Sequence, residues 1–333
     1  MPVQHAPDAL WHQRLRAIGR LWAAAEQGDP EGIHQLRVAS RRVQEALPLA
    51  SGGHHRRRVR RARRKVRALR QALGAVRERD VTLGLLATIE ASHPDARSAV
   101  HLVRQAIRAE RQAALREAAA YLSARSPADL TRKLSRAADG ASDADEGGAR
   151  AGRTDGTDWR LRLAAGVARR VRQLEQAIEH AGGLYAADRL HRVRVSAKKL
   201  RYALELGHEV RLRRWGAAIR SLKQIQDHLG ALQDGEVLMR HIRSVSSSSD
   251  VSTGQEAFAR LTRLLEEDTR QHHARFLRLR ARLLTLCATV RRQASEVLPV
   301  GRPIPRSLSG ADRAAVDARV EMPAASSHRT SRR

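Results

Sequence analysis

Two stretches of the sequence set a histidine at fixed distances from arginine and lysine side chains. The earlier stretch covers residues 34–47 and the later one covers residues 191–204. Both lack Gly and Pro and are rich in Ala, Leu and unbranched side chains, a composition that favours helix. Guanidinium, ammonium and imidazole N–H groups all donate hydrogen bonds to oxyanions. The chemistry that this spacing indicates is therefore the binding of an anion.

The later stretch sorts its basic and apolar residues onto opposite sides of the predicted helix. At about 100° per residue, the histidine and most of the cations fall within a wedge of roughly 80°. That wedge contains His191, Arg194, Lys198 and Tyr202, with Arg201 at its edge. The opposite side carries the apolar residues Val193, Ala197, Leu200 and Leu204. One face is thus suited to a hydrophobic core and the other to an anionic partner.

The earlier stretch sorts in the same way. Its basic side carries His34, Arg37 and Arg41, and its apolar side carries Leu36, Val43 and Leu47. A solvated helix face usually mixes acids with bases as i,i+4 pairs. Neither basic face contains an acid, so we expect these cations to meet an anion that the chain itself does not supply.

The composition agrees with an anionic partner. The chain has 333 residues, with 63 Lys and Arg against 35 Asp and Glu, for a formal net charge of +28. Hydrophobic residues make up 42% and aromatic residues only 3%, so we expect a large aliphatic core. A charge of this size repels itself in a compact protein and attracts polyanions. Nucleic acid, polyphosphate and anionic membranes are the candidate partners.

Other classes of protein are disfavoured. Cys287 is the sole cysteine, so no internal disulfide can form, and we interpret it as a small buried side chain. The N-terminus lacks the basic-then-apolar pattern of a signal peptide. No run approaches the roughly 18 apolar residues of a membrane span. We expect a soluble cytoplasmic protein.

The first half of the chain reads as a series of helices. A helix is expected over 9–27, the next carries His34, and a densely basic one follows over 54–70. Gly74 is expected to end that helix and Asp80 to cap the next one. The remaining helices of this half are predicted over 80–91, 94–124 and 127–138.

The second half repeats this order. Its helices are predicted over 158–180, around His191, over 211–228, over 233–244 and over 254–294, the last with a break near His272 and His273. Residues 73–81 and 229–237 share a Leu-Gly turn pattern that ends in an acid and Val. The interval between the two histidines and the interval between Gly74 and Gly230 differ by one residue, which indicates an internal duplication.

No stretch shows sustained β alternation, so the predicted fold class is all-α, with two four-helix-type bundles. We expect a first helical repeat over 8–138 and a second over 157–295. An acidic, Gly-rich linker is predicted over 139–156, and a disordered tail over 296–333.

The paired His-x-x-Arg-Val helices, each followed by a Leu-Gly turn, resemble the CHAD domain, the conserved-histidine α-helical domain. The resemblance covers roughly residues 10–295, and the Lys-Lys-Leu-Arg-Tyr segment of the later stretch carries it most closely. It implies two four-helix bundles about a pseudo-twofold axis, with basic helices lining a shared groove. It also implies binding of inorganic polyphosphate and, in bacteria, association with polyphosphate granules. This chain would be a stand-alone bacterial member, with Glu78 where the family pattern usually has Asp.

A polyphosphate chain needs rows of hydrogen-bond donors rather than a single pocket. Arginine can grip two phosphate oxygens in a fork, and lysine adds charge with less fixed geometry. The arginines expected to bind phosphate oxygens in pairs are Arg37, Arg41, Arg194 and Arg201. The cations expected to add charge are Arg42, Lys198, Lys199 and Lys223. Arg67 is included because it occupies the position of Lys223 in the other repeat. Tyr202 is expected to pack with its hydroxyl near the groove.

His34 and His191 have two readings. Each could donate an N–H to a phosphate oxygen and become charged when the polyanion arrives, which their place on the basic faces favours. Each could instead be a structural histidine bonded to a carbonyl or to an acid. The acids at hand are Glu78, Asp80, Asp234 and Glu236, which we expect to cap helices and to hold arginine side chains in place.

Three alternatives remain. The first is a nucleic-acid-binding protein, although scarce aromatics leave few platforms for stacking single-stranded bases. The second is a metal-dependent phosphohydrolase that uses the histidines and these acids, although crowded arginines would repel a metal ion. The third is a scaffold whose charge merely keeps it on granules. No nucleophile or Gly-rich phosphate loop accompanies the histidines, so no enzyme activity and no cofactor are predicted.

Overall fold

The structure, a computed structural model, describes residues 6–50, 56–138, 158–248 and 255–297. Within these residues it contains helices and no strand, so the all-α prediction is confirmed. The elements are α1 (Ala6–Glu26), α2 (Pro30–Ala50), α3 (Arg56–Ser92), η2 (Pro94–Ala96), α4 (Arg97–Ser123), α5 (Pro127–Ala138), α6 (Asp158–Ala181), α7 (Ala187–Glu209), α8 (Gly216–Ser248) and α9 (Gln255–Ser295).

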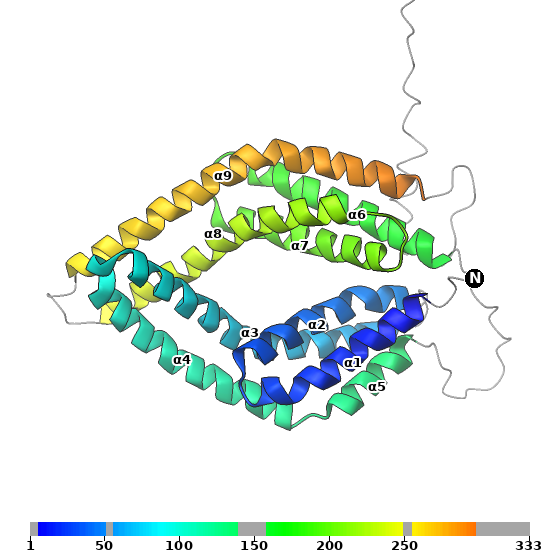
Figure 1. The fold of residues 1–333 in the computed structure, drawn as a ribbon, viewed down its shortest axis with the longest axis horizontal. Helices are drawn as coiled ribbons and strands as arrows, with labels where there is room; N and C mark the ends of the chain where they lie inside the picture. Colours follow the sequence, from blue (N-terminus) through cyan, green and yellow to red (C-terminus); the bar gives the residue numbers. More distant parts are fainter. Residues whose placement is uncertain (1–5, 51–55, 139–157, 249–254, 298–333) are drawn as a thin grey trace, which may run out of the picture.

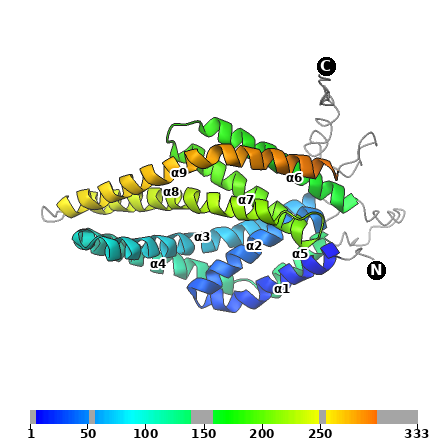
Figure 2. The same cartoon turned by 45° about the horizontal axis from the view of Figure 1, so that its top comes forward.

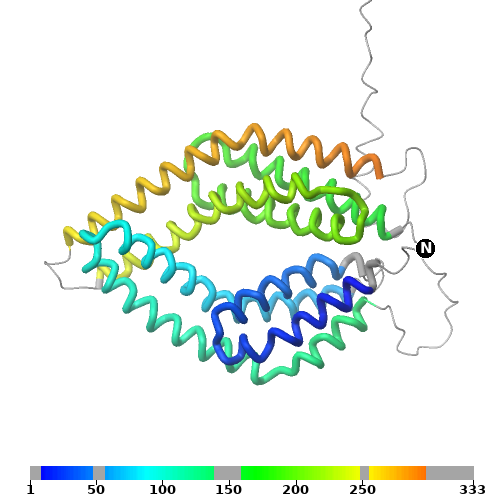
Figure 3. The backbone as a smooth tube through the Cα atoms, in the orientation of Figure 1, coloured from blue at the N-terminus to red at the C-terminus, as the bar shows by residue number. Residues whose placement is uncertain are grey.

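The helices form two groups that face each other across the middle of the molecule (Figure 1). One group contains α1 to α5 and the other contains α6 to α9. The groups converge at the left of Figure 1, where the α3–α4 connection meets α8 and α9. Figure 2 shows α3 beside α4 and α8 beside α9, and the tube in Figure 3 traces these helices toward the converging end. The internal duplication itself stays a prediction.

The apolar helix faces predicted from the sequence are buried. Fully or almost fully buried residues of α2 and α7 include Leu36, Val43, Leu47, Val193, Ala197, Leu200 and Leu204. They join one hydrophobic core with Trp11 and Ile18 of α1 and Leu174 of α6. Because each of these helices commits one face to the core, the opposite basic face is left to point between the two groups.

A second, smaller core closes the converging end. It combines Leu86 and Ile89 of α3 and Val103 of α4 with Leu238 of α8 and Leu261 of α9. These residues come from both halves of the chain, so this end is an apolar contact between the two groups.

The predicted break at Gly74 is wrong. α3 continues from Arg56 to Ser92 through Gly74, and Asp80 lies inside the helix rather than at its start. The Asp80 carboxylate instead accepts a hydrogen bond from Nε of Arg111 on α4, at 2.6 Å. A glycine inside a helix costs about 1 kcal/mol relative to alanine. The packing of α3 on α2 and α4 outweighs that cost.

The second half contains two similar corrections. α8 begins at Gly216, five residues later than predicted, and runs through Gly230 without a break. α9 is also continuous, so the predicted interruption near His272 and His273 is wrong. Arg211, the predicted start of that helix, has a left-handed φ of 54° and lies in the turn after α7.

The start of α2 is capped by a side chain. The Asp29 carboxylate accepts a hydrogen bond from the Gly32 backbone N–H at 2.6 Å, and Pro30 opens the helix. This cap fixes the first turn before His34. The predicted linker over 139–156 and nearly all of the predicted tail over 296–333 lie outside the described residues. No helix among the described residues combines the length and apolar character needed to cross a bilayer.

Candidate polyanion site

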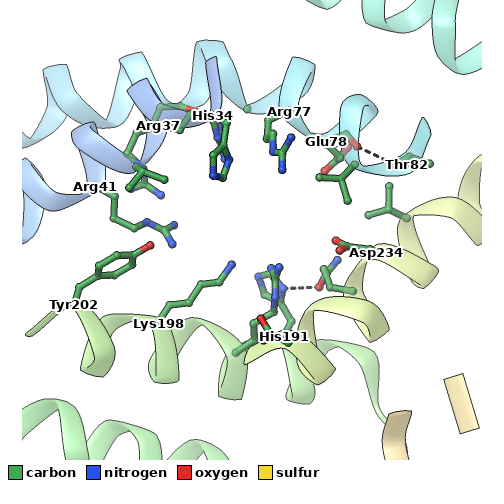
Figure 4. Close-up of a pocket in the computed structure, with 18 residues that line it drawn as sticks. His34, Arg37, Arg41, Arg77, Glu78, Thr82, His191, Lys198, Tyr202 and Asp234 are labelled. Atoms are coloured by element: carbon green, nitrogen blue, oxygen red, sulfur yellow. Dashed lines mark hydrogen bonds between the residues drawn. The ribbon is translucent and has the colours of Figure 1, made fainter. Parts of the chain in front are cut away.

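A pocket of about 550 Å³ lies between the two groups of helices (Figure 4). We call it the central pocket. Its lining comprises His34, Arg37, Val38 and Arg41 of α2; Arg70, Gly74, Arg77, Glu78, Val81 and Thr82 of α3; His191, Arg194, Lys198 and Tyr202 of α7; and Asp227, Gln233, Asp234 and Val237 of α8. Five arginines and one lysine therefore meet three carboxylates in a single cavity.

The α2–α3 wall is built around a close approach of two helices. Nη1 of Arg37 donates a hydrogen bond to the backbone carbonyl of Arg70 at 2.7 Å. Gly74 makes room for this guanidinium, because a Cβ there would lie only 3.2 Å from the same nitrogen. Nη1 of Arg70 in turn donates to Oε1 of Gln44 at 2.6 Å. The acceptors of these two hydrogen bonds are a backbone carbonyl and a side-chain amide, which carry no negative charge to balance the arginines.

The electrostatics of this wall reflect burial among like charges. Desolvation, followed by the charges of Arg41 and Arg77, lowers the pKa of Arg37 below its usual value. Desolvation also lowers the pKa of Arg70 to about 10, with Arg41 and Arg37 adding to the effect. Both guanidiniums remain charged at neutral pH, but their positive charges are poorly compensated.

The α7–α8 wall has a matching arrangement. Gly230 lies beside Arg194, with a Cβ position 3.5 Å from Nη2. Nε of Arg194 is buried and has no hydrogen-bond partner among the residues that the structure describes. Desolvation lowers the pKa of Arg194, while the charge of Asp234 opposes that shift. Burial raises the pKa of Asp234 itself, against the pull of Arg194 and Lys198.

Lys198 is the most perturbed cation of the central pocket. Desolvation, reinforced by Arg194 and Arg41, lowers its pKa from 10.5 to about 7. Figure 4 shows its side chain reaching from α7 toward the opposite wall, near Arg41. At neutral pH this amine is therefore only partly protonated while no anion is bound.

Tyr202 packs beneath the cations and is only 9% exposed. The Arg41 guanidinium lies over its ring, 5.4 Å from the centroid, and that of Arg201 lies at 4.9 Å. Nη2 of Arg201 donates to the tyrosine hydroxyl at 3.2 Å. Tyr202 thus contacts both halves of the molecule, with its hydroxyl at the pocket as the sequence predicts.

The two histidines reach the central pocket from opposite walls (Figure 4). Nδ1 of His191 lies 2.5 Å from Oε1 of Gln233, a contact that orients the ring. Burial lowers the pKa of His34, and the charge of Arg77 lowers it further. Among the described residues, neither histidine is bonded to the acids proposed as partners of a structural histidine, and the partner of His191 is an amide.

The four predicted acids divide into two pairs. Glu78 and Asp234 line the central pocket. Asp80 faces α4, where it pairs with Arg111. Glu236 accepts a hydrogen bond from the hydroxyl of Tyr185 at 2.6 Å and so points away from the pocket. Within the described residues, no group of three or more His, Cys, Asp or Glu side chains is placed to hold a metal ion.

Five of the predicted cations do not line the central pocket. Arg42, Arg67, Lys199 and Lys223 are exposed on other helix faces. Arg201 is the fifth, and its Nε lies 3.6 Å from the Glu205 carboxylate on the same helix. The structure brings together the other predicted basic residues, namely His34, Arg37, Arg41, His191, Arg194 and Lys198.

Five polar residues of the central pocket are absent from the predicted set. They are Arg70, Arg77, Thr82, Asp227 and Gln233. Arg70, Gly74 and Arg77 follow an i, i+4, i+7 spacing, which places them on one face of a continuous helix. That signal was available in the sequence, but a helix that ends at Gly74 conceals it.

Comparisons with known proteins identify a family by sequence and a shared fold by structure. The sequence model described as CHAD domain matches residues 9–243. The crystal structure of the CHAD domain from the plant Ricinus communis superposes with a TM-score of 0.58 at 22% identity, covering 84% of this chain and 91% of that one. PptA from Streptomyces chartreusis superposes with a TM-score of 0.55 at 15% identity, covering 89% and 100%. Both likenesses show a shared fold. No curated protein sequence matches the chain.

Proposed function

The chain belongs to the CHAD domain family, and from that premise we propose that it binds inorganic polyphosphate without cleaving it. The observation that carries the proposal is the excess of arginine and lysine over carboxylates in the central pocket. Polyphosphate carries negative charge on every unit and offers oxygens on all sides. A narrow cavity with donors on both walls suits such a chain.

The opposed walls support a linear ligand. Arg37, Arg41 and Arg77 project from one wall, while Lys198 and His191 project from the other (Figure 4). A phosphate chain that passes between them could use donors on both sides at once. The planar guanidiniums can each take two oxygens, which adds orientation to charge.

The internal charges of the central pocket favour an incoming anion. Nε of Arg194 has no hydrogen-bond partner within the described part of the chain, and the pKa of Lys198 is lowered by its desolvated, cationic surroundings. A buried donor without a partner costs about 1–3 kcal/mol. A bound phosphate oxygen would satisfy that donor and offset the repulsion among the cations.

The same geometry gives no support to catalysis. The hydroxyl of Thr82 donates to the Glu78 backbone carbonyl within its own helix, at 2.9 Å. The Tyr202 hydroxyl is engaged by Arg201. We therefore assign the lining residues to binding, and we propose that binding places the protein on polyphosphate granules in the cytoplasm.

The decisive test is charge reversal inside the central pocket. Arg194→Glu combined with Lys198→Glu should lower affinity for immobilised polyphosphate by orders of magnitude, because the two new carboxylates would repel the phosphates that enter the pocket. The matched control is Arg278→Glu with Arg282→Glu, two exposed arginines of α9 at the same i, i+4 spacing. Circular dichroism would verify that both variants remain helical.

Equal losses in the two variants would show that net charge alone drives binding and would overturn the proposal. The rival phosphohydrolase has its own readout. Phosphate release from polyphosphate with added Mg²⁺ or Mn²⁺, abolished by His191→Ala, would replace binding with catalysis as the function of this pocket.

A further inference from the structure

The N-terminal half of α3 carries a group of exposed cations outside the central pocket. These are Arg57, Arg60, Arg61, Arg63, Arg64, Lys65 and Arg67, and we call them the α3 ridge. None of the seven forms an ion pair or hydrogen bond through its side chain in the described part of the chain. Exposed arginines elsewhere do pair, as Arg270 does with Glu267 at 2.8 Å.

The α3 ridge concentrates positive charge along a short rod. From Arg57 to Arg67 the helix rises about 15 Å, at roughly 1.5 Å per residue. The first acid of α3 is Glu78, well beyond this segment. Like charges three or four residues apart destabilise a helix. Buried Ala62, Val66 and Leu69 hold the segment against the core despite that repulsion.

The cations spread around the helix instead of gathering on one side. At about 100° per residue they cover roughly 200° of the circumference, opposite the buried residues. The α3 ridge is therefore convex, unlike the concave central pocket. A partner that compensates all seven charges must present anions on both sides of a protruding helix.

The groove of a nucleic acid duplex has that form. The major groove of B-form DNA is about 12 Å wide and admits a helix of roughly 10–12 Å diameter, with a phosphate strand on either side. Each strand of the duplex carries one phosphate per about 3.4 Å of the duplex axis, so a dense row of anions lines either side of the groove. Seven cations spread around one helix can face both rows.

The surface of α5 extends this basic region. Lys133 and Arg136 line a hollow of about 310 Å³ together with Arg58, Arg61 and Lys65 of α3, and no acid lines it. A phosphate strand beside α3 would meet these additional cations. Aromatic residues make up only 3% of the chain, which favours duplex DNA over single strands that need stacking platforms.

We propose that the α3 ridge is a binding surface for duplex DNA that contacts the phosphate backbone without reading sequence. It is separate from the central pocket, although one helix serves both. Arg70 and Arg77 of α3 line the pocket, whereas the ridge residues do not. The protein can therefore hold DNA and polyphosphate at the same time.

The test uses the full chain and a short labelled DNA duplex of mixed sequence. Arg60→Glu with Arg64→Glu should lower DNA affinity at physiological salt at least about tenfold. It should also reduce the slope of log affinity against log salt by about 2, one for each lost phosphate contact. Arg278→Glu with Arg282→Glu is the control of equal charge and spacing, and it should change both quantities far less.

The central pocket supplies the second arm of the experiment. Arg194→Glu with Lys198→Glu should retain DNA binding at the ridge, and saturation with short polyphosphate should leave DNA bound. The proposal is overturned if the ridge and α9 variants lose DNA affinity equally, or if neither loses it. It is also overturned if the ridge variant loses polyphosphate but keeps DNA, because the ridge would then belong to the polyphosphate path. None of these results depends on whether the pocket variant loses polyphosphate.

Discussion

At the residue scale, desolvation decides which cations of the central pocket can change their charge. Lys198 has a pKa of about 7 because it is buried beside Arg194 and Arg41, with Arg201 also nearby. Asp234 is the carboxylate that opposes this shift. His34, from the opposite wall, has a pKa lowered by burial and by Arg77. A bound polyanion would favour the protonated form of both groups, so binding and proton uptake are linked.

Polyphosphate affinity should consequently rise as pH falls. Free Lys198 loses its proton above about pH 7, and a bound polyanion raises that pKa, so the contribution is complete below pH 7 and lost as pH rises through the bound-state value. Calorimetry across this range, in buffers of different ionisation enthalpy, measures the protons taken up. Lys198→Met should bind more weakly and take up fewer protons near neutral pH. Identical proton uptake in that variant and the native chain would contradict the assignment.

Folding stability in the absence of ligand should show the opposite trend. The Lys198 pKa is lower in the folded chain than its ordinary value of 10.5, so the unfolded chain binds more protons between about pH 7 and 10.5. Stability from this group therefore rises with pH over that window. Within this window, the melting temperature of Lys198→Met should exceed that of the native chain most near pH 7 and less near pH 10.

Which side chains of α2 and α7 face away from the core could be predicted from the sequence, because helical periodicity alone separates the basic face of each helix from its apolar face. His34, Arg37 and Arg194 follow that rule. Whether an exposed cation such as Lys199 points into a cavity or into solvent depends on a second helix. Periodicity within one helix carries no such information.

At the element scale, two interior glycines allow arginines to approach neighbouring helices. Gly74 lies against Arg37, and Gly230 lies against Arg194. The sequence suggested helix ends at both glycines because Gly favours that position. The local preference yields to the packing of long helices on both sides, and this explains why the lining role of Arg70 and Arg77 was missed.

Alanine substitutions at the two glycines should have different effects on binding. Each alanine should stabilise its helix by up to about 1 kcal/mol through helix propensity. At Gly74 the new Cβ would lie 3.2 Å from Nη1 of Arg37, which is held by the Arg70 carbonyl, so Gly74→Ala should weaken polyphosphate binding severalfold. Gly230→Ala makes an ordinary 3.5 Å contact and should leave binding nearly unchanged. Titrations and urea unfolding of both variants provide the check, and equal effects on binding would contradict this geometry.

At the scale of the whole molecule, the two halves meet on both sides of the central pocket. The converging end is apolar, with Leu86 and Leu238 among its buried residues. Ion pairs cross between the halves elsewhere. Arg14 of α1 contacts Glu209 of α7 at 2.8 Å, and Arg170 of α6 contacts Glu45 of α2. The pocket is thus framed by contacts distant in sequence, which local patterns could not reveal.

The Arg170–Glu45 pair, which joins the two halves beside the central pocket, should contribute measurably to folding stability. Both side chains are only 13% exposed, so Glu45→Gln leaves a largely buried guanidinium without its counter-ion. We expect a loss of about 3 kcal/mol in the free energy of unfolding, measured in urea. Arg170→Met with Glu45→Leu should recover most of it, because both desolvated charges are removed. A double variant no more stable than the single one would show that the pair is not desolvated.

The continuity of α3 has a consequence for how such a protein can vary. Its 37 residues form a rod of roughly 55 Å that carries, in succession, the α3 ridge, the side chains of the central pocket and the apolar residues of the converging end. One inserted residue between Arg67 and Arg70 would turn the first set about 100° relative to the others. Insertions of seven residues, close to two full turns, would nearly restore the angle. The segment between these arginines is therefore constrained in its length as strictly as in its side chains.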